Sequence, residues 1–143
     1  MVAAEAQGLV HRDLKPANLM RVDGPELTVK IIDFGLTKAT TANETDITDG
    51  GVVGTPAFAS PEQFSGAGTD SRSDLHSLGV TLWEMLTGRA LFTGSHADVM
   101  YQQQHAALPL ELLEDIPQPV VALLEVLLDK DPRRRFFFVT SSA

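Results

Sequence analysis

The sequence of 143 residues contains no cysteine. The chain can therefore form neither disulfide bonds nor thiolate metal sites, and its composition fits a reducing compartment, so we expect a cytoplasmic location. Basic residues are also few, because 11 Lys and Arg stand against 19 Asp and Glu, for a formal net charge of −8. Nucleic acid is bound by positively charged surfaces, so no nucleic-acid partner is expected.

Long hydrophobic runs are missing as well. No stretch approaches the roughly 18 consecutive apolar residues of a membrane-spanning helix, so we predict no membrane segment in this chain. Residues 1–7 lack the charged start and apolar middle of a signal peptide. The apolar fraction is 43%, which is ordinary for a globular protein, and the length suits one domain or a piece of a larger one.

Short apolar runs and helical spacing predict an α+β fold that is mainly α. Strands are expected at residues 9–10, 19–22 and 27–32, because these runs are apolar or β-branched and lie between turn signals. Helices are expected at residues 95–105 and 120–128 from their composition and from the prolines around them.

The strongest helix signal covers residues 74–87. Ser71 or Ser73 is predicted to cap this helix and Gly88 to end it. Its apolar residues recur at helical spacing and also occupy the remaining faces; they are Leu75, Leu78, Val80, Leu82, Trp83, Met85 and Leu86. A helix that is apolar nearly all round is predicted to lie buried in the middle of a domain.

The densest polar stretch follows the first predicted strand. It reads His11-Arg12-Asp13-Leu14-Lys15-Pro16-Ala17-Asn18, and apolar residues flank it on both sides. Asp33 follows at the end of the strand predicted at 27–32. One of the carboxylates of Asp13 and Asp33, together with the amide of Asn18, can chelate Mg²⁺. The other carboxylate can orient a hydroxyl nucleophile and accept its proton, and Lys15 can neutralise charge on the phosphoryl group. The pattern predicts metal-assisted phosphoryl transfer.

Six motifs in the same order resemble those of serine/threonine protein kinases, from residue 8 to about residue 136. They are the catalytic loop at 11–18, the metal-binding triplet Asp33-Phe34-Gly35, the substrate-side loop Gly54-Thr55-Pro56, the end of the activation segment at Ser60-Pro61-Glu62, the start of the central helix at 73–79, and a late Asp-Pro-x-x-Arg element at 131–135. Ser60, followed by Gln63, is similar to bacterial members of the family.

The resemblance implies a role for each matching residue of the reaction centre. Asp13 would be the catalytic base and Lys15 the phosphate contact. Asn18 and Asp33 would hold Mg²⁺, with ATP as the phosphoryl donor and a Ser or Thr of a protein as the acceptor. Lys15 directly after Leu14 matches the serine/threonine type, and Thr55 agrees with it.

The resemblance also implies residues that support and regulate this centre. Arg12 would sense a phosphate on the activation segment 33–62, and Thr45 or Thr48 is the hypothetical phosphorylation site. The alternative for this Thr-rich stretch is a plain solvated linker. The structural roles are as follows: His11 and Phe34 would stack in the spine between lobes, Asp74 would bind the backbone of the catalytic loop, and Glu62 would pair with Arg135.

The histidines other than His11 are expected to be ordinary structural or surface residues. No metal-ligand spacing joins His76, His96 and His105. His76 stands at a position where the family more usually has Trp or Tyr.

The resemblance covers only part of a kinase domain. No glycine-rich loop of the kind that covers ATP phosphates is found, and Gly66-Ala67-Gly68 lies after Glu62 rather than between strands. The nucleotide-binding lysine is also missing, because Lys30 lies on the strand that leads to Asp33. We therefore expect residues 1–143 to form a truncated kinase domain, a kinase-like C-terminal lobe with the N-terminal lobe absent, which has little or no activity alone.

Two other interpretations stay open. The chain could be a non-catalytic kinase-like fragment or protein-binding module that uses the groove beside the helices at 74–87 and 95–105. It could also result from a misplaced start or a broken gene. The missing lobe could be supplied by a partner.

Overall fold

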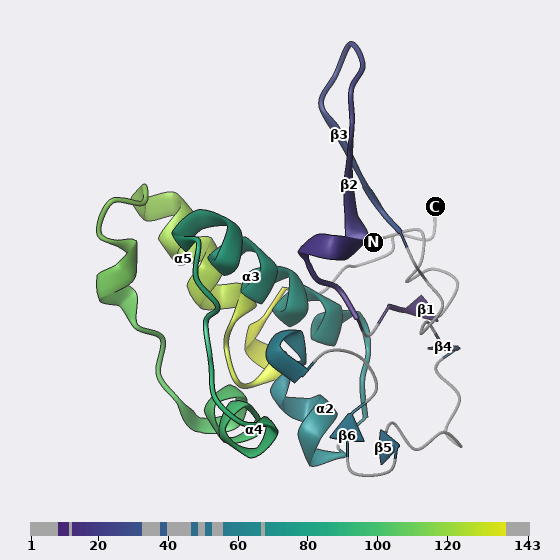
Figure 1. Ribbon diagram of the computed structural model, residues 1–143, viewed down its shortest axis with the longest axis vertical. Helices are drawn as coiled ribbons and strands as arrows, with labels where there is room; N and C mark the ends of the chain where they lie inside the picture. Colours follow the sequence, from purple (N-terminus) through teal and green to yellow (C-terminus); the bar gives the residue numbers. More distant parts are fainter. Residues whose placement is uncertain are drawn as a thin grey trace.

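The computed structural model of the chain describes residues 9–11, 13–32, 38–39, 47–48, 51–52, 56–66 and 68–136 (Figure 1). Helices dominate this part of the chain, and its strands form three short antiparallel pairs. The predicted α+β fold of mainly α character is confirmed at this level. No helix among the described residues combines the length and the apolarity needed to cross a bilayer.

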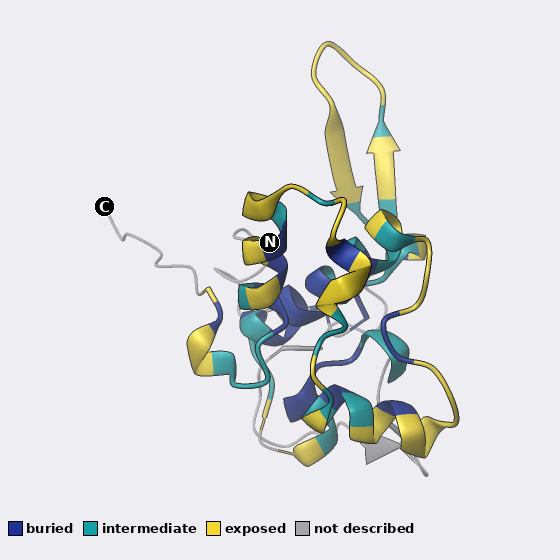
Figure 2. Ribbon diagram, turned by 90° about the vertical axis from the view of Figure 1, so that its left-hand side faces the viewer, coloured by how far each residue is buried: buried dark blue, intermediate teal, exposed yellow. Residues whose placement is uncertain are grey.

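The strands lie in the first half of the chain. The pairs are β1 (Leu9–Val10) with β4 (Lys38–Ala39), β2 (Leu19–Val22) with β3 (Thr28–Ile31), and β5 (Ile47–Thr48) with β6 (Gly51–Val52). The hairpin of β2 and β3 projects away from the helices in both views (Figures 1 and 2). The predicted strands at 9–10 and 19–22 are confirmed, and β3 is one residue shorter at each end than the predicted run 27–32.

The α-helices follow the last strand; they are α2 (Pro61–Ser65), α3 (Ser71–Thr87), α4 (His96–His105) and α5 (Gln118–Leu127). Short 3-10 turns occur along the whole described chain; they are η1 (Pro16–Asn18), η3 (Pro56–Phe58), η4 (Leu110–Leu113) and η5 (Pro132–Arg134). Capping boxes begin two of the helices: the backbone N–H of Ser60 donates to Gln63 Oε1 at 2.9 Å before α2, and that of Ser95 to Asp98 Oδ2 at 3.0 Å before α4.

The start of α3 differs from the prediction. The helix begins at Ser71, and Asp70 rather than Ser71 or Ser73 is its cap, because the Asp70 carboxylate accepts a hydrogen bond from the backbone N–H of Arg72 at 2.8 Å. The same carboxylate forms an ion pair with the Arg72 guanidinium at 2.7 Å, which gives Asp70 an advantage that a serine cap would not have. Gly88 ends the helix in a left-handed conformation (φ 69°), as predicted.

The prediction that α3 is buried nearly all round is wrong for its last turn. Val80 and Trp83 are almost fully buried, whereas Met85 is 63% exposed and Leu86 41% exposed. The core lies on the side of Val80 and Trp83, and among the described residues no element covers the opposite side. Helical spacing alone does not distinguish these two apolar sides.

The hydrophobic core lies between α3, α5 and the segments that join the helices (Figure 2). Its buried residues are Val80, Trp83, Leu91, Phe92, Leu113, Val121, Leu124 and Leu128. α3 and α5 approach closely at Gly79, where a Cβ atom would lie 2.9 Å from Leu127 Cβ and 3.0 Å from Leu128 Cδ2. The missing side chain of Gly79 therefore sets the distance between the two helices.

His76 is a buried polar residue of α3, and one of its ring nitrogens lacks a hydrogen-bond partner among the described residues. Its ring is 1% exposed, and its Nδ1 has no hydrogen-bond partner among the described residues. Burial lowers the pKa of His76 well below 6.5, and the positive charges of Arg135 and Lys130 lower it further. The folded state therefore holds this ring in its neutral form.

We expect the chain to lose stability in mild acid through His76. The unfolded chain binds a proton at a pKa of about 6.5 while the folded chain does not, so the free energy of unfolding falls as the pH drops below that value. Between pH 7 and pH 5.5 the loss from this one residue is roughly 1 kcal/mol. Urea denaturation of the wild type and of His76→Phe at both pH values measures it, and equal pH dependence of the two proteins would contradict the prediction.

Candidate active site

The polar loop at residues 11–18 is attached to the first turn of α3. The backbone N–H of His11 donates a hydrogen bond to Asp74 Oδ2 at 2.8 Å, and both residues are buried. The two residues are 63 positions apart in the sequence. This contact fixes the start of the loop against a buried helix, and it is the contact that the sequence assigned to Asp74.

Both ring nitrogens of His11 take part in hydrogen bonds. Its Nδ1 accepts from the backbone N–H of Asp13 at 3.1 Å, and its Nε2 lies 3.1 Å from the carbonyl oxygen of Ile32. A backbone N–H can only donate and a carbonyl can only accept, so the ring is neutral with its proton on Nε2. His11 therefore holds the loop to the end of β3.

A second connection joins the same two segments at the other end of the loop. The backbone N–H of Ile32 donates to the carbonyl oxygen of Asn18 at 2.8 Å, next to the β-ladder that pairs Leu19 with Ile31. The backbone of Ile32 is thus hydrogen-bonded to both His11 and Asn18. Asp33, which follows Ile32 directly in the sequence, lies outside the described residues.

The polar side chains of the loop converge. Lys15 Nζ lies 3.3 Å from Asp13 Oδ2, and Asn18 Nδ2 donates to the carbonyl oxygen of Asp13 at 2.6 Å. Asp13 and Asn18 are 7% and 4% exposed, while Lys15 is partly exposed. The hydrogen bond orients the Asn18 amide, whose Oδ1 is the atom that can serve as a cation ligand.

The oxygen donors of this loop are of the chemical type that binds a hard divalent cation. Asp13 and Asn18 offer carboxylate and amide oxygens, which Mg²⁺ prefers, and such sites usually include one or two protein ligands together with phosphate oxygens. Within the part of the chain that the structure describes, no group of three or more acidic or histidine side chains could hold a metal ion.

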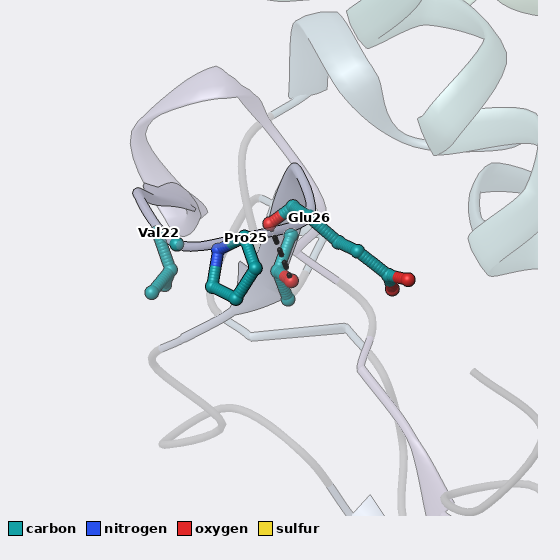
Figure 3. A pocket seen from close by; sticks show the side chains of 5 residues that line it. Val22, Pro25 and Glu26 are labelled. Carbon is teal, nitrogen blue, oxygen red and sulfur yellow. Dashed lines mark hydrogen bonds between the residues drawn. The ribbon is translucent and has the colours of Figure 1, made fainter.

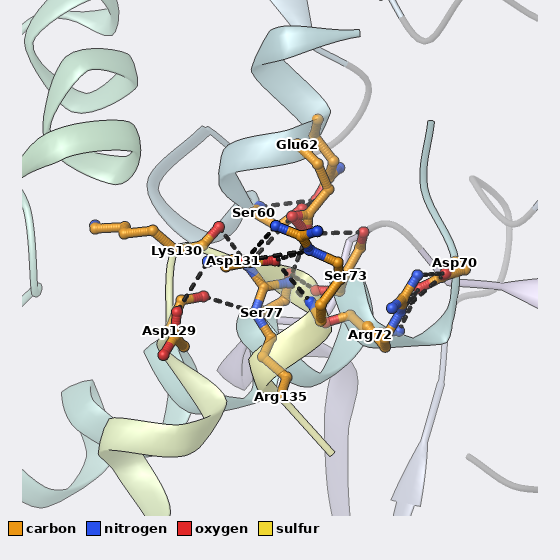
Figure 4. A network of polar contacts seen from close by, with 12 residues as sticks. Ser60, Glu62, Asp70, Arg72, Ser73, Ser77, Asp129, Lys130, Asp131 and Arg135 are labelled. Atoms are coloured by element: carbon orange, nitrogen blue, oxygen red, sulfur yellow. Dashed lines mark hydrogen bonds and ion pairs between the residues drawn. The ribbon is translucent and has the colours of Figure 1, made fainter. Parts of the chain in front are cut away.

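A second buried cluster lies where α2, α3 and the segment before η5 meet (Figure 4). The Arg135 guanidinium binds the Glu62 carboxylate through two hydrogen bonds, Nη1 to Oε1 at 2.6 Å and Nη2 to Oε2 at 3.2 Å. Their side chains are 0% and 7% exposed. Ser73 Oγ donates to the same Glu62 oxygen at 3.1 Å, and Arg135 Nε donates to the Asp129 carbonyl at 2.7 Å.

Two polar residues, one buried and one partly buried, were missed by sequence reasoning. Gln103 is 0% exposed, and its Nε2 donates to the carbonyl oxygen of Ala57 at 2.9 Å. Lys130 Nζ donates to the carbonyl oxygen of Gln102 at 3.0 Å and lies 4.8 Å from the centre of the Phe92 ring. Burial lowers the pKa of Lys130 to about 8, with a further contribution from Arg135. Gln103 lies in a run of three glutamines that resembles a solvated helix surface, so the sequence carried no signal of its burial.

A surface depression lies at the turn of the β2–β3 hairpin (Figure 3). It is lined by Val22, Gly24, Pro25, Glu26 and Thr28, and Thr28 Oγ1 donates to the Glu26 carbonyl at 3.4 Å. None of the residues predicted for the active site lines it. We assign it no part in the chemistry.

The structure describes part of the predicted site. It brings together His11, Asp13, Lys15, Asn18 and Asp74 around the loop, and it joins Glu62 to Arg135 in the second cluster. Thr48 lies in β5. The remaining predicted residues lie outside the described part of the chain; they are Arg12, Asp33, Phe34, Thr45 and Thr55.

Comparison with known proteins agrees with the sequence motifs. The sequence matches the protein kinase domain family over residues 4–140. It is 39% identical over 140 residues to the serine/threonine-protein kinase PknL of Mycobacterium tuberculosis, covering 95% of this chain and 34% of that protein. It is 42% identical over 137 residues to the serine/threonine-protein kinase A of Synechocystis sp., covering 92% and 26%. Over 92 residues it is 48% identical to the serine/threonine-protein kinase Pkn1 of Myxococcus xanthus, covering 63% and 13%. The chain spans about a third or less of the length of these curated relatives.

Proposed function

Because the chain belongs to the protein kinase family, we propose that its loop at residues 11–18 is the catalytic loop of a protein serine/threonine kinase. The reaction would transfer the γ-phosphoryl group of ATP to a serine or threonine hydroxyl of a protein. Bacterial serine/threonine-protein kinases are among the relatives, which supports this substrate class. The family generally uses ATP and Mg²⁺, and the oxygen donors of the loop suit that cation.

One observation carries the proposal. Ile32 is bonded to His11 at one end of the loop and to Asn18 at the other. Asp33 is the next residue in the sequence, and the family motif implies that it shares a cation with Asn18 while Asp13 serves on the same loop.

Each side chain of the loop then has a chemical task. Asp13 orients the acceptor hydroxyl and takes its proton, and its carboxylate lies beside the Lys15 ammonium. Lys15 contacts the phosphoryl group and balances its charge. Asn18 and Asp33 would hold Mg²⁺, which supplies charge neutralisation on the phosphate oxygens when bound.

The regulatory part of the proposal concerns Arg12 and the threonines of the activation segment. Arg12 would bind a phosphate on Thr45 or Thr48, because a phosphothreonine carries up to two negative charges that a guanidinium can pair with. Phe34 and Thr55 would keep the roles that the family motifs give them. Mass spectrometry that finds only unmodified threonines in an active form would contradict the phosphorylation site.

Binding of Mg·ATP tests the proposed centre directly. We expect calorimetric titration into the 143-residue chain to give micromolar binding that Asp33→Ala abolishes, because that change removes a carboxylate ligand of the cation. Asp23→Ala is the matched control, since Asp23 is exposed after β2 and pairs with Arg21 on the surface. Binding heat that survives in Asp33→Ala, or no heat in the wild type, would contradict the proposal.

A second candidate function is a non-catalytic protein-binding module. The observation that favours it is the exposure of large apolar side chains on α3 and α4, where Met85 is 63% exposed and Tyr101 is 64% exposed. Absence of Mg·ATP binding by the wild-type chain would favour this function.

A further inference from the structure

Gln103 makes a long-range contact with the turn that precedes α2. Its side chain is fully buried on the inner side of α4, and its Nε2 donates to the carbonyl oxygen of Ala57 at 2.9 Å. Ala57 lies 46 residues earlier, in η3 (Pro56–Phe58). Inside η3 the backbone N–H of Ala59 donates to the Pro56 carbonyl at 3.2 Å, which leaves the Ala57 carbonyl for Gln103.

The chemistry of this amide indicates that the contact with Ala57 is the reason for its burial. A carbonyl can only accept, so Nε2 must face Ala57 and Oε1 must point the other way. Oε1 is buried and has no hydrogen-bond partner among the described residues. One turn earlier, the inner face of α4 carries the apolar Val99. An apolar residue at 103 would avoid the unpaired oxygen, but it would leave the Ala57 carbonyl without its donor.

The segment from Ala57 to Glu62 is therefore held at two points by distant parts of the chain. Gln103 binds its first end, and Arg135 binds Glu62 at its second end. Lys130 joins the two attachments, because its Nζ donates to the carbonyl of Gln102 while its own carbonyl accepts from Arg135 Nη2 at 3.4 Å. α4 is thus tied to the same cluster that anchors α2.

We propose that Gln103 is a positioning residue that fixes the 56–58 turn against α4 and thereby sets how tightly a serine- or threonine-containing peptide is bound. The proposal rests on the proposed function, in which the loop at 54–56 lies on the substrate side. Gln103 acts through the Ala57 carbonyl and takes no part in the transfer step. Its effect is therefore expected on the affinity for the peptide and not on the affinity for Mg·ATP.

Gln103→Met tests the proposal with little change in side-chain volume, and methionine also removes the unpaired buried oxygen. Gln102→Met is the matched control, because Gln102 Nε2 donates to the Thr93 carbonyl at 2.8 Å and does not reach η3. Hydrogen–deuterium exchange of residues 56–60 is expected to be about tenfold faster in Gln103→Met and unchanged in Gln102→Met. In a fluorescence-anisotropy titration with a degenerate library of labelled serine and threonine peptides, which needs no phosphoryl transfer, Kd for the peptide is expected to rise about tenfold in Gln103→Met at unchanged Kd for Mg·ATP.

The two measurements separate the possible failures. Equal exchange of residues 56–60 in Gln103→Met and the wild type would overturn the positioning role, whatever the activity. Faster exchange with an unchanged peptide Kd would overturn the substrate role. A wild-type chain that binds no peptide would also overturn the substrate role, whereas a wild-type chain that binds no Mg·ATP would contradict the proposed function. In either case the exchange experiment would still decide whether Gln103 holds the turn.

Discussion

Replacing Arg135 by methionine should lower the free energy of unfolding by about 3–5 kcal/mol, because the change leaves the Glu62 carboxylate buried without its cation. The guanidinium is 0% exposed, binds both Glu62 oxygens, and also donates to the carbonyls of Arg72 and Asp129. Single domains are stable by only about 5–15 kcal/mol, so this loss would consume much of the total. Urea denaturation followed by circular dichroism measures it.

Two further variants show whether burial is the cause. Arg133→Met removes an ion pair with Asp131 in which the arginine is 83% exposed, and its expected cost is small because water screens exposed charges. The double variant Glu62→Met/Arg135→Met removes both charges and should recover part of the loss, because no unpaired charge then stays buried. A similar small cost for Arg133→Met and Arg135→Met would contradict the prediction.

Replacing Asp74 by leucine should release the catalytic loop from α3. The change removes the acceptor of the buried His11 N–H, and a hydrogen bond to a charged group is worth about 1.5–3 kcal/mol. If opening of the loop limits exchange, the amides of residues 13–18 should exchange roughly 10- to 150-fold faster. Hydrogen–deuterium exchange at pH 7 measures this local effect.

Asp70→Ala is the control for Asp74→Leu, because both carboxylates belong to the start of α3. Loss of the Asp70 cap is expected to lower global stability by about 1 kcal/mol without selective exposure of the loop. Equal effects of the two variants on residues 13–18 would show that Asp74 supports only the helix, and would contradict its role as the anchor of the loop.

The parts of the site that could be predicted are those that short motifs specify. Each motif carries its own residue types at fixed spacing, which makes the resemblance to protein kinases recognisable. That resemblance implied the contacts of Asp74 with the loop backbone and of Glu62 with Arg135, across 63 and 73 residues. The short strands and the cap at Ser60 could likewise be read from local patterns. The chemical roles of Asp13, Lys15 and Asn18 stay proposals for the experiments above.

The parts that could not be predicted depend on tertiary packing. Gln103 and its neighbours are equally polar, and only the position of α4 against η3 decides that Gln103 is buried. In the last turn of α3, apolar residues are exposed instead of buried. Met85 and Leu86 are as apolar as the buried Trp83 and yet lie on the exposed side. Asp70 and two nearby serines were all suitable residues for the N-cap of α3. The ion pair between Asp70 and Arg72 cannot be deduced from the helical spacing of apolar residues.

The ion pair between Glu62 and Arg135 also affects when this part of the chain can fold during synthesis. Arg135 follows Glu62 by 73 residues, so at a synthesis rate of about 5–20 residues per second the arginine is made about 4–15 s after the glutamate. Throughout that interval the Glu62 carboxylate lacks its cation, although Ser73 can already donate to it, and the corner between α2 and α3 cannot reach its final packing. The order of synthesis, rather than the helix propensity of residues 61–65, therefore determines when this corner of the nascent chain closes.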